Sequence, residues 1–438
     1  MAIVTPRIIG LETEYSLLHN NPSMSWVHYN VADELLRPIS QDYNAFCNFM
    51  ENGSRLYSDH GEHPEYATPE TDNIKDAVIY DKAGEKILYG LCAKLEDNMM
   101  QKGDERKVRL IKNNSHKGQS WGCHENYLAS RNLLPFSYFS LVAMPFLVAR
   151  TVYSGAGKSG PTIEDYEISG RAEFISKEIG ITTTSNRPII NTRDEPHADI
   201  EKYLRIHLIY GDSNMLEYST MLKLGTTSIV ISLMEDKLCP KLYLAEPVNA
   251  LHAISKDYKL EQKYYVGDKK NISAVQILRE YFSAAEKVYP NIGEELQDNT
   301  LEKVMEEWDF TLTALEKRDF NSLIGKIDWI TKTYLIDKEM SRKGKDGQKN
   351  SYLFDLMYSR IYPAGLGQLY FARSPIVERI CTDAEIEKAM RNPPQTTRAL
   401  SRSRHILSGL VESVSWDNIK LKNGRTLSSK DPREIEYQ

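Results

Sequence analysis

The sequence predicts an α+β fold with α/β texture, divided into a large domain and a small C-terminal domain. Short stretches of alternating polarity, typical of strands, interchange with longer stretches whose apolar residues recur at helical spacing. The chain has 438 residues, which is enough for one large domain and a smaller one. The pattern changes to short elements after about Ala364, so we expect domains over residues 1–363 and 364–438.

The first 113 residues alternate between the two kinds of element. Apolar residues such as Ile74, Val78 and Leu91 recur at roughly helical spacing. Pro64 is expected to end a strand, because proline cannot donate a hydrogen bond to a sheet. The expected elements are a buried strand over 7–18, a helix over 31–50, a strand in the first half of Asn52–Glu70, a helix over 74–101 and a strand over 107–113.

The rest of the chain has strands between helices. Gly225 costs helix propensity, which indicates a close backbone contact there. Apolar residues from Leu301 to Leu315 form one stripe, which we assign to the core. Lys338–Asn350 is predicted to be a mobile charged loop, with a basic docking patch as the alternative. The expected elements are a helix over 127–152 broken near Pro135 and Pro145, strands over 187–192 and 203–210, and helices over 215–235, 274–289 and 297–317.

Composition limits the class of function. The chain is 41% hydrophobic and 26% charged, as in ordinary globular proteins, and its net charge of −6 argues against nonspecific nucleic-acid binding. Its five cysteines are dispersed, which suits reduced thiols. No signal-peptide pattern opens the sequence, and the longest apolar run, Tyr138–Tyr153, is too short and interrupted to span a bilayer. We therefore expect a cytoplasmic protein without nucleic-acid or membrane partners.

Polar side chains share one face of the strand that follows Asn52. Side chains on a strand alternate between faces, so Arg55, Tyr57 and Asp59 lie together. A cation, a phenol and a carboxylate in a row suit a site for an anionic, metal-bound substrate better than a core. Arg55 is expected to neutralise phosphate oxygens, and Asp59 is a candidate general base. The alternatives are an ion pair of Arg55 with a nearby glutamate and a turn-capping role for Asp59.

A second polar row lies near the N-terminus, where Glu12 and Glu14 share a strand face. Two buried glutamates repel each other unless a cation lies between them. Magnesium prefers oxygen ligands and is usually held by a few carboxylates with phosphate oxygens and water. The candidates are Glu12, Glu14 and Glu65, with His63 or Tyr57 nearby; the alternative for Glu12 is a salt bridge. We expect these strands to form one wall of an ATP–magnesium site.

Two further polar segments are less decisive. Asn191–Asp199 is dense in polar residues, and Arg205 and His207 follow closely. Contacts to substrate or phosphate and a solvated loop fit this composition equally well. His124 begins a pattern like that of a zinc-protease helix, but Leu128 occupies the position of the second histidine. That interpretation of His124 is therefore rejected.

Several motifs are specific in combination and extend over almost the whole chain. They are Arg-Ile-Ile-Gly-Leu-Glu-Thr-Glu-Tyr (7–15), Asn-Gly-Ser-Arg-Leu-Tyr (52–57), His-Pro-Glu-Tyr-Ala-Thr (63–68), Gly-Cys-His-Glu-Asn-Tyr-Leu (122–128), Ile-Asn-Thr-Arg-Asp-Glu-Pro-His-Ala-Asp (190–199) and Pro-Pro-Gln-Thr-Thr-Arg (393–398). Together they resemble the Pup ligase/depupylase family, which is related to carboxylate–amine ligases of the glutamine synthetase type. The resemblance implies a large glutamine synthetase-like domain, with a curved antiparallel sheet packed by helices, and a small C-terminal domain contributing to the nucleotide site.

The resemblance also implies roles for individual residues, with ATP and Mg²⁺ as cofactors. Asp59 matches the catalytic aspartate of the family. The positions that match the magnesium site are Glu12, Tyr57 and Glu65. The positions that match contacts to ATP are Arg55, Thr68 and Trp416. Of these, Thr68 and Trp416 come from the resemblance alone, whereas the others agree with the shared strand faces.

The ligase branch of the family phosphorylates the side-chain carboxylate of the C-terminal glutamate of Pup, a small disordered protein modifier. A substrate lysine then attacks the acyl phosphate, which gives an isopeptide bond. The resemblance therefore implies Pup and lysine-bearing proteins as partners and, indirectly, the bacterial proteasome. The other branch deamidates the C-terminal glutamine of Pup and removes Pup from its targets.

The length of one segment favours the ligase. The depupylase branch usually has a long insertion between the first two polar strands, whereas here only the 36 residues Ser16–Glu51 lie between them. The dipeptide Asp59-His60 and the segment 252–255 favour the depupylase instead. A divergent small-molecule carboxylate–amine ligase of the glutamate–cysteine type is a further alternative.

Overall fold

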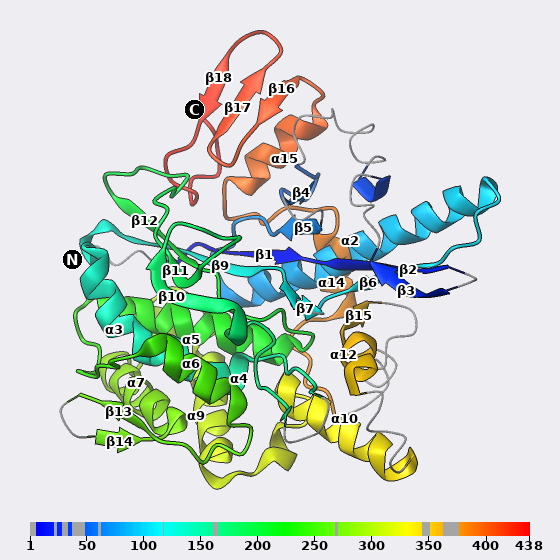
Figure 1. Ribbon diagram of the computed structural model, residues 1–438. Helices are drawn as coiled ribbons and strands as arrows, with labels where there is room; N and C mark the ends of the chain where they lie inside the picture. Colours follow the sequence, from blue (N-terminus) through cyan, green and yellow to red (C-terminus); the bar gives the residue numbers. More distant parts are fainter. Residues whose placement is uncertain are drawn as a thin grey trace.

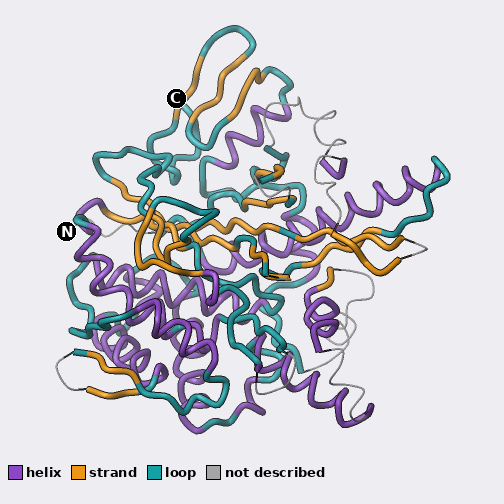
Figure 2. The backbone as a smooth tube through the Cα atoms, in the orientation of Figure 1, coloured by secondary structure: helices purple, strands orange, loops and turns teal. Residues whose placement is uncertain are grey.

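The computed structural model describes residues 6–21, 24–28, 34–36, 49–59, 63–116, 118–160, 165–267, 270–343, 351–361 and 376–438. A large sheet carries a layer of helices on one face, and a small C-terminal sheet lies beyond its other face (Figure 1). Figure 2 shows most of the helices gathered on one side of the central strands, with α15 (Ala399–Leu407) on the other side next to the C-terminal sheet. The predicted α+β fold is confirmed.

Seven strands form the central sheet, and neighbours are antiparallel except β10 and β11. In β1, Ile9, Leu11 and Thr13 are buried, whereas Glu12 and Glu14 on the opposite face are half-buried. Alternation along the strand thus directs the glutamates away from the helices. In spatial order the strands are β10 (Ile175–Gly180), β11 (Arg187–Asn191), β12 (Tyr203–Leu208), β9 (Cys123–Ser130), β1 (Ile9–Glu14), β5 (Pro64–Ala67) and β4 (Arg55–Ser58).

The helices and the inner face of this sheet enclose the main hydrophobic core. Trp308 is fully buried there, as the apolar stripe predicts. A Cβ atom at Gly225 would lie 2.5 Å from Val304 Cγ2, so the predicted close contact is present between two helices. The helices of this layer are α2 (Ile74–Gln101), α3 (Phe136–Ala149), α4 (Thr151–Ser154), α5 (Glu217–Glu235), α6 (Pro247–Lys256), α7 (Ala274–Val288), α8 (Ile292–Glu295) and α9 (Leu301–Lys317).

Smaller units surround this body. A four-stranded sheet has the order β15 (Arg360–Ile361), β6 (Val108–Ile111), β2 (Ser16–Asn21), β3 (Met24–His28), and the short pairs are β7 (Ser115–His116) with β8 (Gln119–Ser120) and β13 (Tyr264–Val266) with β14 (Lys270–Ile272). The remaining helices are α10 (Asp328–Lys343), α12 (Ser351–Ser359), α14 (Asp383–Ala389), α15 (Ala399–Leu407) and the 3-10 turns η1 (Arg131–Leu133), η3 (Ala172–Phe174) and η4 (Phe320–Leu323). The C-terminal sheet of β16 (Val411–Val414), β17 (Asn418–Leu421) and β18 (Thr426–Ser428) has its own small core.

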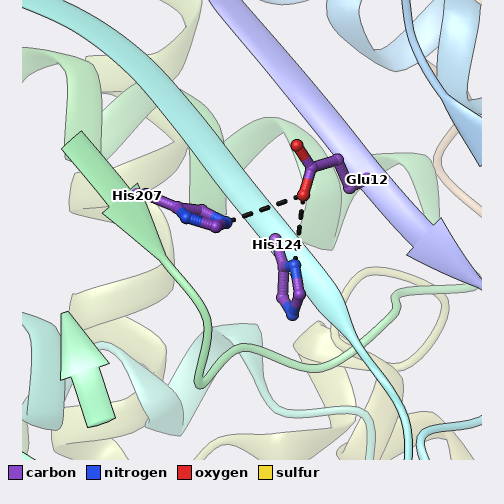
Figure 3. Close-up of side chains that lie close together, drawn as sticks. All are labelled: Glu12, His124 and His207. Atoms are coloured by element: carbon purple, nitrogen blue, oxygen red, sulfur yellow. Dashed lines mark hydrogen bonds and ion pairs between the residues drawn. The ribbon is translucent and has the colours of Figure 1, made fainter. Parts of the chain in front are cut away.

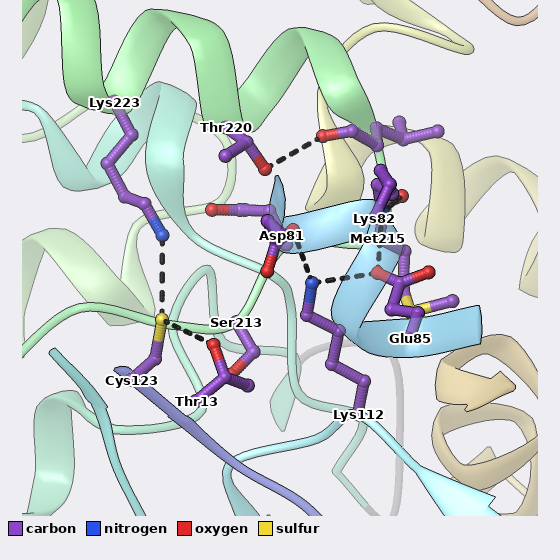
Figure 4. A network of polar contacts seen from close by, with 12 residues as sticks. Thr13, Asp81, Lys82, Glu85, Lys112, Cys123, Ser213, Met215, Thr220 and Lys223 are labelled. Carbon is purple, nitrogen blue, oxygen red and sulfur yellow. Dashed lines mark hydrogen bonds and ion pairs between the residues drawn. The ribbon is translucent and has the colours of Figure 1, made fainter. Parts of the chain in front are cut away.

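A buried polar network ties the helices to the sheets behind β1 (Figure 4). Lys112, directly after β6, donates to Asp81 (2.7 Å) and Glu85 (2.8 Å) of α2. Lys223 of α5 lies with its Nζ 3.7 Å from Cys123 Sγ of β9. Because buried charges are tolerated only when they are paired or hydrogen-bonded, this network fixes the relative positions of these elements.

Most elements predicted from sequence are confirmed, and several predictions are wrong in part. Pro64 begins β5 instead of ending a strand, since β4 already ends at Ser58, and α3 continues through Pro145. Residues 127–130 belong to β9 rather than to a helix, because they pair with β1 and β12 in the middle of the sheet. The segment 338–343, predicted as a loop, forms the end of α10. The rest of that predicted loop, most of the helix predicted over 31–50 and the predicted domain boundary at 363/364 lie outside the described residues. Within the described ranges, every helix is too short or too polar to cross a bilayer.

Candidate active site

A cavity of about 1390 Å³ lies on the face of the central sheet opposite the helices. Its floor is made by outward-facing side chains of β1, β4, β5, β9 and β12. Pockets for single ligands usually have volumes of about 300–1,000 Å³, so this one has room for a nucleotide and a second substrate. All seven predicted site residues line it: Glu12, Arg55, Tyr57, Asp59, Glu65, Thr68 and Trp416.

The Glu12 carboxylate faces two histidines on the cavity floor (Figure 3). His124 is its cross-strand partner on β9, and His207 comes from β12. Glu12 Oε2 is 3.1 Å from His124 Nδ1 and 3.6 Å from His207 Nε2. Its other oxygen accepts hydrogen bonds from Arg205 Nη2 (3.1 Å) and Asn126 Nδ2 (3.2 Å). Three strands therefore converge on one carboxylate.

These contacts determine the protonation states in the cluster. Burial alone would raise the pKa of Glu12, but the hydrogen bond to His124, the nearby His207 ring and the charge of Arg205 hold it well below its usual range. Burial lowers the pKa of His207 to about 4, and neither of its ring nitrogens has a hydrogen-bond partner in the described chain. Ligand atoms of Glu12, His124 and His207 lie within 4.8 Å of one another. A carboxylate oxygen beside two imidazole nitrogens is a donor set that fits a divalent metal ion.

Glu65 and Tyr57 form the acidic side of the floor, on the directly paired strands β5 and β4. The Tyr57 hydroxyl donates to Glu65 Oε1 at 2.5 Å. Burial, followed by the charges of Glu12 and Glu14, raises the pKa of Glu65 well above its usual range. A carboxylate in this environment binds either a proton or a cation, and its oxygens are the donors that magnesium prefers.

Arg55 lies beside this pair on β4, and Asp59 is the first residue after β4. The Arg55 guanidinium lies over the Tyr57 ring, 4.5 Å from its centroid, and pairs with no carboxylate among the described residues. The predicted alternative, an ion pair with a glutamate, is therefore wrong for this part of the chain. Asp59 Oδ1 accepts a hydrogen bond from the His63 backbone N–H (2.7 Å), so Asp59 does cap a turn while also lining the cavity.

Thr68 and Trp416 lie towards the opposite end of the cavity. Thr68 Oγ1 accepts a hydrogen bond from the Leu11 backbone N–H (3.0 Å), which fixes it beside β1. The Trp416 ring packs edge-on against Phe49, with ring centroids 4.9 Å apart, and Arg402 lies 4.9 Å over its face. The tryptophan thus reaches the cavity from the C-terminal sheet region, and Phe49 and Arg402 fix its position.

Glu70 fastens the C-terminal part to the central sheet. It accepts hydrogen bonds from Arg398 (2.8 Å to Nε) and from both terminal nitrogens of Arg402. Arg402 also donates to the Gly53 carbonyl at 2.9 Å. Although burial opposes its ionisation, the two arginines lower the pKa of Glu70 to about 2. This buried triad holds α15, and with it Trp416, against the β4–β5 hairpin.

The second polar segment divides between the site and the surface. Arg205 and His207 contact Glu12, whereas Asp194 pairs with Arg131 (2.7 Å) outside the site. His124 is the residue that sequence reasoning missed. Its alternation with Asn126 on a strand would have placed it on the cavity face, but no strand is predicted over β9, and residues 127–130 are predicted as helix.

The whole chain is similar to known Pup ligases. Residues 7–420 match the family model described as Pup-ligase protein. The chain is 37% identical over 438 residues to the Pup–protein ligase of Kineococcus radiotolerans, covering 97% of this chain and 96% of that one. It is 38% identical over 442 residues to the Pup–protein ligase of Acidimicrobium ferrooxidans, covering 97% and 95%.

Two solved structures have the same fold. The complex between the prokaryotic ubiquitin-like protein Pup and its ligase PafA superposes with a TM-score of 0.89 at 34% identity, covering 99% of this chain and 91% of that one. PafA in complex with ADP gives a TM-score of 0.81 at 34% identity, covering 95% and 93%. This chain therefore belongs to the Pup ligase family. The predicted family and the class of enzyme, an ATP-dependent ligase, are confirmed.

Proposed function

We propose that this protein joins Pup to lysine side chains of other proteins, in a reaction that uses ATP and Mg²⁺. The observation that carries the proposal is the single cavity floor on which Glu12, Arg55, Asp59 and Glu65 lie together. Support also comes from the relatives, which match over nearly their full length and are Pup–protein ligases.

The chemistry needs an activated carboxylate. A carboxylate is a poor electrophile, and phosphorylation of the C-terminal glutamate side chain of Pup supplies a leaving group. Thr68 and Trp416 hold the nucleotide, and Arg55 neutralises oxygens of the transferring phosphoryl group. Glu12 and Glu65 hold the magnesium ion, with Tyr57 orienting Glu65. Bound there, the ion offsets phosphate charge.

The second step joins the acyl group to an amine. A lysine, with an ordinary pKa of about 10.4, is mostly protonated at neutral pH and cannot attack. Asp59 removes its proton as the C–N bond forms and phosphate leaves. The turn that holds Asp59 Oδ1 against the His63 N–H directs this carboxylate towards the cavity.

Reconstitution tests the reaction. Incubation with ATP, Mg²⁺, Pup ending in glutamate and a lysine-bearing protein should give a conjugate whose mass equals the sum of both proteins minus one water. Omission of ATP, or methylation of the target lysines, should abolish it. Release of Pup from a preformed conjugate, without any conjugation, would show that the protein is a depupylase instead.

Asp59→Asn tests the assignment of the base. The amide oxygen can still accept from the His63 N–H, so the turn should persist. We expect conjugation to fall by about 10²–10⁴-fold, the usual contribution of a general base, with nearly unchanged ATP binding. Asp309→Asn, which alters an exposed carboxylate paired with Arg279, is the control. An active Asp59→Asn variant would remove Asp59 from the mechanism.

We place this reaction in the cytoplasm, where ATP is available, and expect the bacterial proteasome to receive the conjugates. In cells, loss of proteasome activity should then raise the level of conjugates made by this enzyme, as measured by blotting for Pup. An unchanged level of conjugates would mean that the proteasome does not degrade the products of this enzyme.

A further inference from the structure

Arg171 differs from every other buried arginine in the described chain. Five arginines there are buried, and Arg171 is only 1% exposed. The hydrogen bonds of its guanidinium group all go to uncharged oxygens, namely the Ile209 carbonyl (2.8 Å), the Trp121 carbonyl and Ser120 Oγ (3.3 Å), while its backbone N–H donates to Asp212 Oδ1 (3.1 Å). The other four are paired with glutamates: Arg7 with Glu235, Arg150 with Glu125, and Arg398 and Arg402 with Glu70.

A second arginine without a carboxylate lies next to it. Arg187 donates to the Thr183 carbonyl (2.9 Å) and the Ser120 carbonyl (2.9 Å). Because Arg171 also contacts Ser120, the same residue lies between the two guanidinium groups. No ion pair joins Arg187 to a carboxylate in the described ranges, and its Nη1 makes no hydrogen bond there. Both side chains line the cavity.

Placing two buried cations side by side without a carboxylate of the described residues in direct contact with either guanidinium group is costly, and the cost is evident in their pKa values. Burial, together with the charge of Arg187, lowers the pKa of Arg171 to about 10 despite the opposing charges of Glu14 and Asp212. Burial likewise lowers the pKa of Arg187. Both remain charged at neutral pH. Such an arrangement is typical of a site that receives an anion.

The sheet places these cations at the Asp59 end of the cavity. Arg187 is the first residue of β11, Glu14 is the last of β1 and Ser58 is the last of β4. The strand pairing places these three residues at the same end of the strands. Asp59 follows directly. Thr68 comes after the opposite end of β5, which runs antiparallel to β4. The cation pair therefore lies with the residue that we assign to the lysine, away from the residues that we assign to the nucleotide.

We infer that Arg187, with Arg171 behind it, binds the free α-carboxylate of the C-terminal glutamate of Pup. This inference rests on the proposed function. The α-carboxylate keeps its charge throughout the reaction, whereas the side-chain carboxylate becomes an acyl phosphate and then, as phosphate leaves, an uncharged amide. A fixed pair of guanidinium groups matches a carboxylate with constant charge. Arg171 is a positioning residue. It contributes positive charge near Arg187 without contacting the α-carboxylate, because its own N–H groups donate to oxygens of the protein.

The site explains how the enzyme would select a terminal glutamate. An internal glutamate has a peptide carbonyl in place of the α-carboxylate and would leave both cations without an anion. Binding at Arg187 also fixes the Cα of the terminal residue, so that its side chain extends towards Glu65 and Asp59. The shared chemistry, an oxyanion, could also be the terminal phosphate of ATP, and the experiment separates the two.

The test compares two forms of Pup with two forms of the enzyme. One Pup has the natural C-terminal carboxylate and the other a C-terminal α-amide, with the side-chain carboxylate intact in both. With the α-amide, kcat/KM of the unmodified enzyme should fall by about 10–100-fold, as expected for a lost charged hydrogen bond. Arg187→Gln should lose a similar factor with natural Pup and should no longer discriminate between the forms. Its KM for ATP should be unchanged.

Controls keep the outcomes distinct. Arg187→Lys should recover part of the discrimination, because it keeps the charge but not the planar fork. Arg279→Gln on the surface of α7 should behave like the unmodified enzyme, and thermal unfolding checks that each variant is folded. Equal turnover of both forms by the unmodified enzyme, or a raised KM for ATP in Arg187→Gln with discrimination retained, would overturn the inference. Failure of the unmodified enzyme to conjugate natural Pup would instead refute the proposed function.

Discussion

Glu65 and Glu70 are five residues apart and both buried, yet their surroundings are opposite. Glu70 receives hydrogen bonds from Arg398 and Arg402, which lower its pKa to about 2 although burial opposes this. Glu65 receives one phenolic hydrogen bond and is surrounded by other acids, and burial with these charges raises its pKa well above the usual range. One carboxylate is neutralised within the protein and the other is not.

The difference separates a structural role from a functional one. A buried charge that the fold itself neutralises contributes to docking and needs nothing else. A buried acid that the fold leaves next to further acids is stable only when it holds a proton or a cation. The same reasoning distinguishes Arg402, which is paired, from Arg171, which is not. Residues whose charge the chain leaves unmatched therefore mark where ligands bind.

Replacing each glutamate with glutamine should have opposite consequences. Glu70→Gln leaves two buried arginines without a full counter-charge and should lower the free energy of unfolding by about 3–5 kcal/mol. Glu65→Gln resembles the protonated form that burial and the neighbouring acids favour, so the metal-free protein should lose far less stability than Glu70→Gln does. Instead, the Mg²⁺ concentration that half-saturates conjugation should rise by about tenfold or more.

Thermal unfolding in EDTA and Mg²⁺ titrations of activity measure the two effects. Each variant is the matched control for the other, since both replace one buried glutamate of the same segment with glutamine. A large loss of stability in Glu65→Gln, with unchanged Mg²⁺ dependence, would place Glu65 among the structural acids.

The pH dependence of stability should also have opposite signs. The pKa of Glu70 falls from 4.5 to about 2 on folding, so its contribution is present above pH 4.5 and is lost as the pH falls towards 2. This amounts to about 3 kcal/mol. The pKa of Glu65 rises from 4.5 on folding, so its contribution is present below pH 4.5 and is lost as the pH rises through the raised value.

Unfolding in EDTA from pH 2 to 9 measures both contributions as differences between variant and unmodified protein. The stability gap to Glu70→Gln should close as the pH falls to 2. Glu65→Gln should become the more stable protein as the pH rises. Parallel curves for all three proteins would contradict the assigned charges.

Helices with strong periodicity could be predicted closely from sequence, because the spacing of apolar residues that indicates a helix lies within one continuous segment. The helix over 74–101 matches α2, and the apolar stripe up to Leu315 is core. Residues 127–130 were misassigned because a short apolar run looks the same in a buried strand and in a helix. Their pairing with β1 depends on residues more than 100 positions away.

The same limit applies to the site. Alternation within a strand is enough to place Glu12 and Glu14 on one face. It does not identify the neighbouring strands, and the partners His124 and Arg205 come from β9 and β12. Thr68 and Trp416 have no local pattern that distinguishes them, and only family resemblance points to them. Glu65 and Glu70 differ in the charges of the side chains around them. Many of those side chains are distant in sequence and become neighbours only in the folded chain.

Tyr57→Phe should have the smallest effect. It tests whether the Tyr57 hydroxyl acts through its hydrogen bond to Glu65 or binds the metal itself. The Arg55 guanidinium lies over the Tyr57 ring, a contact that phenylalanine retains, so only the 2.5 Å hydrogen bond to Glu65 is lost. Loss of one hydrogen bond, about 1 kcal/mol, corresponds to a roughly fivefold rise in the Mg²⁺ concentration needed for half-maximal conjugation. Tyr203→Phe, which removes a similar phenol–carboxylate bond to Asp431 (2.7 Å), should leave the Mg²⁺ dependence unchanged. A loss of about 100-fold would instead mean that the Tyr57 oxygen binds the metal directly, because removing one neutral hydrogen bond cannot account for that much.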